Sequence, residues 1–344
     1  MERLAPRPMA SRLARAWLLA LVALLCATRG GIAAPSSTLD LVLIESAETS
    51  YATAASRLKQ VVEARSSGRL RINLHLDGRF GTRTLEDLDM VSAVRAGTVS
   101  MALVSSAPLS NLCAELEVLN DPFLFRDYGH VWRVLDGKVG LELLASPLRH
   151  GLRGLAFFDG GFRLFASTRP IASLSDFRGL RVRTLQNRTY VGLVKAFQGV
   201  PVPAAINKIR TMVTRGFIDA ADRSYPTYGS LDLYDVLRYV TETNHAYAAK
   251  VLIVNEAALA ALPREQRDLL VQAVSEVAHR HRDDFRAEIE RVRKRALSRG
   301  VKIITLSADQ RRAFETASRP VQEEVVRLAG RVLVERVRSA ASPR

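Results

Sequence analysis

Residues 263–298 read PREQRDLLVQAVSEVAHRHRDDFRAEIERVRKRALS, and this stretch decides the fold. Its apolar residues recur at helical spacing, first at positions 269, 270, 274 and 277 and again at 285, 289, 292 and 297. Pro263 suits a first helical turn, and nothing breaks the pattern before Gly300. The stretch predicts one helix of roughly 50 Å, from about 35 residues at a rise of about 1.5 Å each. Because that length exceeds one small lobe, we expect the helix to cross from one lobe to another.

The chain before this helix alternates predicted strands and helices. Its first part has the order βαβαβ, which implies a parallel sheet with helices on its faces. The predicted strands cover residues 39–45, 70–76, 101–104, 154–158, 162–167, 181–184, 200–202 and 251–254. The predicted helices cover residues 51–64, 127–144 and 189–198. A further helix is predicted to begin near residue 84, and residues 313–337 form an amphipathic region. The pattern predicts an α/β fold.

The first 33 residues have the features of a cleaved export signal. Arginines at positions 3, 7, 12 and 15 precede an apolar segment over 16–26, and small residues lead to a predicted cleavage after Ala33. The apolar segment is shorter than the roughly 20 residues of a membrane span, and no later segment reaches that length. We therefore expect a soluble protein in the periplasm.

Removal of the signal leaves about 310 of the 344 residues and a formal charge of about +11 in place of +15. Cys113 is then the only cysteine, so no intrachain disulfide can form. The densest basic run, residues 291–299, ends a predicted helix, where cations suit the helix dipole. Aromatic residues are not interleaved with these cations, as stacking on nucleic acid would require. We expect no nucleic-acid partner.

Two arginines stand at the edges of short apolar strands. Arg163 ends GLAFFDGGFR, residues 154–163, and Arg183 ends DFRGLRVR, residues 176–183. A guanidinium is always charged, and its planar set of donors matches a carboxylate with two parallel bonds. Two such groups in an exported α/β protein predict capture of a small organic anion.

Six segments in a fixed order resemble a known family. They are VSSAPLS (104–110), LNDPFLFRD (119–127), HVWRVLDG (130–137), RPIASLSDFRGLRVR (169–183), LYDV (233–236) and ALPREQ (261–266). On these segments the chain resembles, over residues 39–340, the solute-binding proteins of tripartite ATP-independent periplasmic (TRAP) transporters, of the dicarboxylate-receptor type.

The resemblance implies a two-lobed periplasmic binding protein with hinge strands and a long helix spanning both lobes. It places lobe I at residues 37–160 plus about 249–285, and lobe II at 161–248 plus about 286–344. Arg183 matches the family's central arginine, which binds the solute carboxylate, and Arg163 matches a second pocket arginine. The implied function is a receptor that delivers an organic acid to a TRAP permease.

The chain also departs from the family pattern. Arg223 stands where the family has a pocket asparagine, and Arg210 follows Lys208 where the family commonly has Glu-Val-Tyr. Either the pocket takes a more highly charged anion, or these arginines pair with acids such as Asp222. Two further residues are pocket candidates: Ser105 could donate a hydrogen bond to the solute, and Phe158 could face the cleft.

Other functions fit the sequence less well. A sensory receptor that presents the same solute to a signalling partner remains an alternative. Nothing in the sequence indicates an enzyme, because it shows no nucleophile–base pair and no cofactor loop. His279 and His281 are two residues apart on a helix and point to different faces, so we expect no metal site. We expect a monomer without a cofactor.

Overall fold

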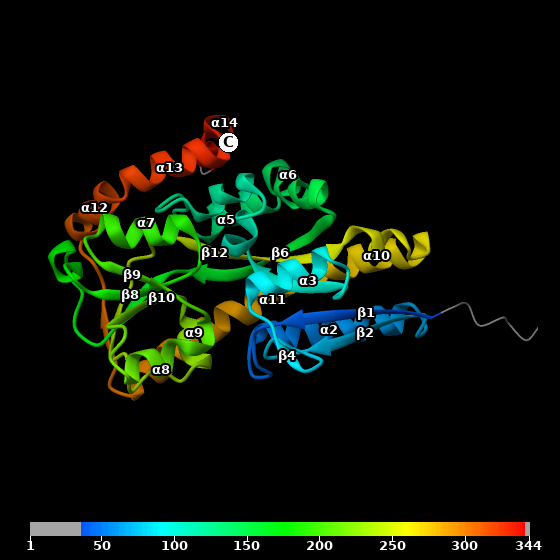
Figure 1. Ribbon diagram of the computed structural model, residues 1–344, viewed down its shortest axis with the longest axis horizontal. Helices are drawn as coiled ribbons and strands as arrows, with labels where there is room; N and C mark the ends of the chain where they lie inside the picture. The colour runs from blue at the N-terminus through cyan, green and yellow to red at the C-terminus, as the bar shows by residue number, and fades with distance from the viewer. Residues whose placement is uncertain (1–35, 341–344) are drawn as a thin grey trace, which may run out of the picture. The chain divides into compact units, whose positions relative to one another are not determined.

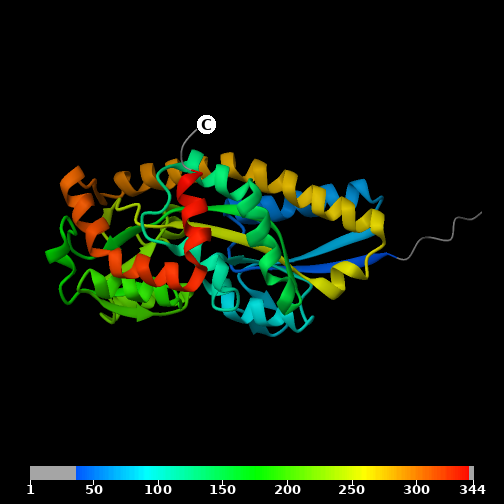
Figure 2. The same ribbon diagram turned by 90° about the horizontal axis from the view of Figure 1, so that it is seen from above.

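A computed structural model describes residues 36–340 of the chain, so the predicted signal peptide lies outside the described residues. The helix predicted from residues 263–298 is present as α11, Arg264–Ser298, a single helix of 35 residues that follows Pro263. It runs past both β-sheets (Figures 1 and 2). Its buried residues change partners along its length: Leu270 and Val277 pack in the core of one sheet, and Val292 and Ala296 in the core of the other.

The first lobe is built on a five-stranded sheet with the order β2-β1-β5-β12-β6. Strands β1 and β5 are parallel, whereas β12 is antiparallel to both β5 and β6. The elements that form this lobe are β1 (Ser37–Leu43), α2 (Ser50–Arg65), β2 (Leu70–His75), α3 (Asp87–Arg95), β5 (Met101–Ser105), β6 (Leu152–Phe162) and β12 (Tyr247–Asn255). A short hairpin, β3 (Arg79–Phe80) and β4 (Arg83–Thr84), lies between β2 and α3 in the chain.

The second lobe is built on a six-stranded mixed sheet with the order β13-β11-β7-β10-β8-β9. Its strands are β7 (Leu164–Ser167), β8 (Arg181–Thr184), β9 (Val200–Pro203), β10 (Ala220–Arg223), β11 (Tyr239–Thr241) and β13 (Lys302–Ile304). Its α-helices before α11 are α7 (Arg188–Ala196), α8 (Ile209–Thr214) and α9 (Tyr225–Ser230). The α/β, two-lobed fold expected from the sequence is confirmed.

The chain crosses between the sheets through two neighbouring strands. Strand β6 passes into β7 at Arg163, and β12 returns to the first sheet after β11. The Arg163 backbone N–H donates to the Ala246 carbonyl over 2.8 Å and joins the two crossings. Gly160 allows the close approach, since a Cβ there would lie 1.8 Å from the Ala248 carbonyl oxygen. These strands occupy the place expected of the hinge.

The predicted helix over residues 127–144 is two helices, α5 (Tyr128–Leu135) and α6 (Lys138–Ala145). They turn at Gly137 and pack closely at Gly140, where a Cβ would lie 1.9 Å from the Leu135 carbonyl oxygen. The prediction of one helix was therefore wrong at this turn. The other short helices are α4 (Ser106–Ser110), α10 (Glu256–Ala260) and the 3-10 helices Ala114–Asn120, Ser146–His150, Leu174–Phe177 and Ile206–Lys208.

The C-terminal helices differ from the expected lobe boundary. After α12 (Ala308–Ala317), helices α13 (Arg319–Ala329) and α14 (Arg331–Ser339) return to the first lobe. Val325, Val334 and Val337 belong to the core that also holds Val118 and Leu119. The assignment of all residues from 286 to 344 to lobe II therefore does not hold for α14, because its apolar stripe is buried against lobe I. Among residues 36–340, no helix combines the length and the apolar character that a bilayer crossing requires.

Candidate functional site

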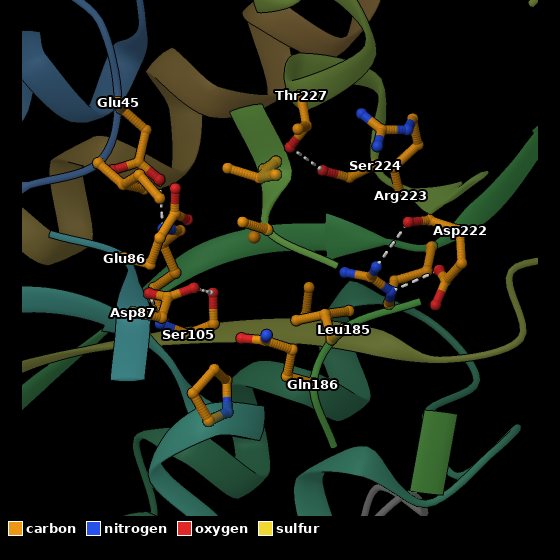
Figure 3. A pocket seen from close by; sticks show the side chains of 18 of the residues that line it. Glu45, Glu86, Asp87, Ser105, Leu185, Gln186, Asp222, Arg223, Ser224 and Thr227 are labelled. Atoms are coloured by element: carbon orange, nitrogen blue, oxygen red, sulfur yellow. Dashed lines mark hydrogen bonds and ion pairs between the residues drawn. The ribbon is translucent and has the colours of Figure 1, made fainter. Parts of the chain in front are cut away.

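A pocket lies where the two sheets face each other, and residues of both lobes line it. Figure 3 shows the labelled residues of the two walls: Glu45, Glu86, Asp87 and Ser105 on one side, and Asp222, Arg223 and Ser224 on the other. Arg163, Gly160 and Lys250, which belong to the crossing strands, also line the pocket. The pocket therefore combines two lobes with the strands that join them.

Sheet topology brings three arginines to this pocket. Arg183 in β8 lies beside β10, where its Cα partner is Ala221, and Arg223 ends β10. The carboxyl ends of parallel strands meet at the same sheet edge, so both arginines reach that edge. Strand β7 is antiparallel to β10, so the start of β7 lies beside the end of β10. Arg163 immediately precedes β7 and therefore reaches the same edge. Residues 60 positions apart in the chain thus share one wall.

Asp222 binds one of these arginines. Its Oδ1 accepts a 2.7 Å hydrogen bond from Arg163 Nε, and its carbonyl accepts a 2.9 Å bond from Arg163 Nη2. His245 Nε2 lies 3.3 Å from the same Oδ1. Burial alone would raise the pKa of the Asp222 carboxyl, but the charges of Arg163 and His245 hold it below its ordinary value. The Arg163 guanidinium, which also lies 4.9 Å from the centre of the Tyr190 ring, is therefore already paired.

Arg183 is held in place but keeps donors free. Its Nε donates to the Ala204 carbonyl over 2.8 Å, and its side chain is buried. Within residues 36–340, its two terminal nitrogens have no hydrogen-bond partner. Burial, and next the positive charge of Arg163, lower the pKa of Arg183 to about 10, so it remains a cation near neutral pH. An oriented cation with free donors is suited to hold a carboxylate.

Arg223 is the most isolated of the three. It is 1% exposed, and none of its three side-chain nitrogens has a hydrogen-bond partner among the described residues. Burial, together with the charges of Arg183 and Arg163, lowers its pKa well below the ordinary value. Of the two alternatives left open by the sequence, pairing with an acid applies to Arg210, which is bound by Asp235, and not to Arg223.

The opposite wall is rich in hydrogen-bond acceptors. Glu45 forms an ion pair with Lys250, and the Asp87 carboxylate accepts bonds from the backbone N–H and the hydroxyl of Ser105, at 3.0 and 3.1 Å. Burial raises the pKa of Glu86, the residue that precedes α3. Carboxylates in this position can accept hydrogen bonds from the hydroxyl groups of a ligand.

Two of the six candidates lie outside the pocket. Arg210, in α8, forms an exposed ion pair with Asp235 at 2.7 Å. Phe158 is 3% exposed and packs against His281 and Phe285 in the core beneath α11. In β6, alternate side chains enter two opposite cores: Phe157 lies in one, and Phe158 lies in the other, which also holds residues of α11. Ser105 does line the pocket, although its hydroxyl is already bonded to Asp87.

The sequence did not lead us to four residues that line the pocket: Glu45, Glu86, Asp87 and Lys250. Glu45 lies two residues beyond the end of β1, and the rule that strand ends meet at one edge could have found it. Lys250 offers no such signal, because it lies within the apolar strand β12. Among the described residues, no group of three or more histidine, cysteine or acidic side chains could hold a metal ion.

Comparison with known proteins agrees with this architecture. The family model DctP, described as bacterial extracellular solute-binding protein, family 7, matches residues 42–327. The 2,3-diketo-L-gulonate-binding periplasmic protein YiaO of Escherichia coli is 30% identical over 253 residues, which is 73% of this chain and 76% of that protein. The C4-dicarboxylate-binding periplasmic protein DctP of Rhodobacter capsulatus is 24% identical over 86% of this chain and 88% of its own length.

A solved structure matches the fold closely. It is a TRAP periplasmic solute-binding protein from a Bradyrhizobium species in complex with galacturonate, with a TM-score of 0.83 and 27% identity. The match covers 88% of this chain and 99% of that one.

Proposed function

Because the chain belongs to the DctP family of bacterial extracellular solute-binding proteins, we propose that it binds a small organic acid through arginine–carboxylate contacts and delivers it to a TRAP-type membrane permease. Family membership makes the chain a TRAP-type receptor for small acids and not an enzyme. The family is periplasmic, and the predicted cleavage after Ala33 would release the chain into that compartment. The relatives support a small acid as the ligand: 2,3-diketo-L-gulonate and galacturonate are hydroxylated acids of six carbons, and the C4-dicarboxylates are acids of four.

One observation carries the proposal. Arg183 is buried in the pocket wall, its Nε is fixed by the Ala204 carbonyl, and its terminal nitrogens are left without partners among the described residues. A ligand carboxylate would supply the missing acceptors and an opposite charge. The bond between two such groups is charge-assisted and about twice as strong as a neutral hydrogen bond. The acceptors on the facing wall would bind hydroxyl groups of the same ligand.

Thermal-shift measurements with a panel of acids test the proposal. The panel contains galacturonate, glucuronate, galactonate and succinate, with the neutral sugar galactose as a control. A true ligand raises the melting temperature in proportion to RT ln(1 + [L]/Kd). At least one acid should stabilise the protein, and galactose should not. Stabilisation by galactose and by none of the acids would overturn the proposal.

Calorimetry on an Arg183 variant tests the residue. Arg183→Ala should weaken binding of the best acid by at least about 3 kcal/mol, roughly a hundredfold, because the desolvated carboxylate loses its partner. Arg183→Lys should also bind poorly, since an ammonium group cannot reproduce the planar set of donors. Arg178→Ala, which removes an exposed arginine five positions earlier, should bind normally. Full-strength binding by Arg183→Ala would show that the anion binds elsewhere.

A further inference from the structure

Arg223 is a buried cation that the protein itself leaves unsatisfied. Its Nε, Nη1 and Nη2 are all buried, and none has a hydrogen-bond partner among residues 36–340. Arginine does not lose its proton in proteins, so the site holds a full charge. A buried charge without a partner is costly, and in a ligand-binding pocket the ligand is the group that can remove this cost.

The acids near Arg223 are already in use. Asp222 is bound by Arg163 through both its carboxylate and its carbonyl. The charge of Asp222 acts on both Arg183 and Arg223, and Arg183 is also influenced by the negative charges of Asp87 and Glu86 on the opposite wall. Three guanidinium groups on this wall therefore face one carboxylate. A ligand with a single negative charge would still leave one positive charge uncompensated.

The second negative charge of the ligand must lie close to the first. On the opposite wall, the described pocket residues Glu45, Glu86 and Asp87 supply three acidic groups. Lys250 is the one cation among the described pocket residues on this side, and it is paired with Glu45. A carboxylate at the far end of the ligand would meet these acids and be repelled. Hydroxyl groups at that end would instead find acceptors.

We infer that the preferred ligand is a hydroxy acid whose head carries two negative charges close together, and that Arg223 binds the second of them. This inference rests on the proposed function and goes one step further, because it makes Arg223 a specificity-determining residue. The second charge can come from a nearby carboxylate or from a phosphate ester, which share the chemistry that a guanidinium recognises.

Pairs of acids that differ in one charged group test the inference. Tartronate and glycerate share a three-carbon hydroxylated skeleton, and tartronate has a second carboxylate on the carbon that bears the first. 2-Phosphoglycerate and glycerate form the corresponding phosphate pair. Galactarate and galactonate form a third pair, in which the extra carboxylate is at the far end. By titration calorimetry, the wild-type protein should bind the more highly charged member of the first or second pair at least about tenfold tighter. It should show no such preference for galactarate.

Arg223→Gln should remove the preference. The ratio of affinities within the discriminating pair should fall to within about twofold, while the singly charged acid keeps its affinity within about fivefold. Arg210→Gln is the matched control: it removes the same charge from an exposed ion pair outside the pocket and should leave the ratio unchanged. The pair whose two members bind with different affinities shows whether the second group is a carboxylate or a phosphate.

The outcomes separate this inference from the proposed function. If the wild-type protein binds acids but does not prefer the more highly charged member of the first or the second pair, the inference is wrong and the receptor function stands. If Arg223→Gln keeps the wild-type ratio, Arg223 does not determine specificity. If none of the acids binds, the proposed function itself fails.

Discussion

Asp222 gives three chemically identical side chains different roles. It pairs with Arg163 at 2.7 Å, and that pair connects the second sheet to the crossing strands. The other two arginines, Arg183 and Arg223, are also buried. Among the described residues, no acidic side chain lies within hydrogen-bond distance of either. Because a buried ion pair contributes little net stability, its main effect here is to determine which arginines stay available for a ligand.

A buried acid in the crossing strand should make stability depend on pH. Asp159, in β6, accepts hydrogen bonds from Tyr247 Oη at 2.6 Å and from the Gly161 N–H at 3.0 Å, but its Oδ2 is buried without a partner among the described residues. Burial raises its pKa from 3.8 to about 6, although these bonds oppose the shift. The folded protein therefore loses stability as the pH rises from about 3.8, the ordinary pKa of the group, to about 6, and the full loss is present above pH 6.

Asp159→Asn should stabilise the protein at pH 8 by about 1–3 kcal/mol, because the amide mimics the neutral acid and a shift of one pKa unit corresponds to about 1.4 kcal/mol. The gain should shrink as the pH falls to 5. Urea denaturation at both pH values measures it. The exposed Asp235 is a suitable control, because Arg210 lowers its pKa and Asp235→Asn should therefore give no gain at pH 8. A gain for Asp159→Asn that is equal at pH 5 and pH 8 would contradict this account.

At the scale of elements, α11 belongs to both lobes. Val277 and Phe285 pack in the core of the first sheet, and Val292 and Ala296 in a core of the second. Ile289 packs against both cores. The helix therefore joins the two lobes, as the strands β6 and β12 also do, and its unbroken apolar pattern explains why the sequence revealed it so clearly.

The pairing of β6 and β12 depends on one glycine. A Cβ at Gly160 would lie 1.8 Å from the carbonyl oxygen of Ala248, an atom of the backbone that cannot move without separating the strands. Gly160→Ala should therefore destabilise the protein by at least about 3 kcal/mol or prevent folding, as severe overpacking does. Denaturation midpoints, or the yield of folded protein, measure the effect.

Gly192→Ala is the control for this substitution. Gly192 lies in helix α7, and the nearest atom to its added Cβ would be Val321 Cγ2 at 3.6 Å, an ordinary contact. Because alanine favours a helix over glycine by about 1 kcal/mol, this variant should be as stable as the wild-type protein or more so. Equal stability of the two variants would mean that the close approach at Gly160 is not required.

At the scale of the whole molecule, the lobes should close on the ligand. Two lobes joined by a strand pair and a helix typically close by a hinge motion around a bound ligand. Small-angle scattering should show a smaller radius of gyration when the best acid of the panel is present at saturation. Arg183→Ala at the same acid concentration should show no change. An identical profile for the wild-type protein with and without ligand would rule out a hinge mechanism.

Elements with a local signal could be predicted from the sequence. The helix of residues 264–298, the alternation of strands and helices and the two strand-edge arginines Arg163 and Arg183 followed from periodicity and residue type, and the family resemblance predicted the two-lobed arrangement. Which charges meet depends instead on how distant segments pack. Asp222 and Arg223 are adjacent in the chain and both line the pocket, but the Asp222 carboxylate is bound by Arg163, which leaves Arg223 without an acid within hydrogen-bond distance among the described residues. Lys250 reaches the pocket, Arg210 remains outside and α14 returns to the first lobe, because each contact depends on how distant segments pack, which no local pattern contains.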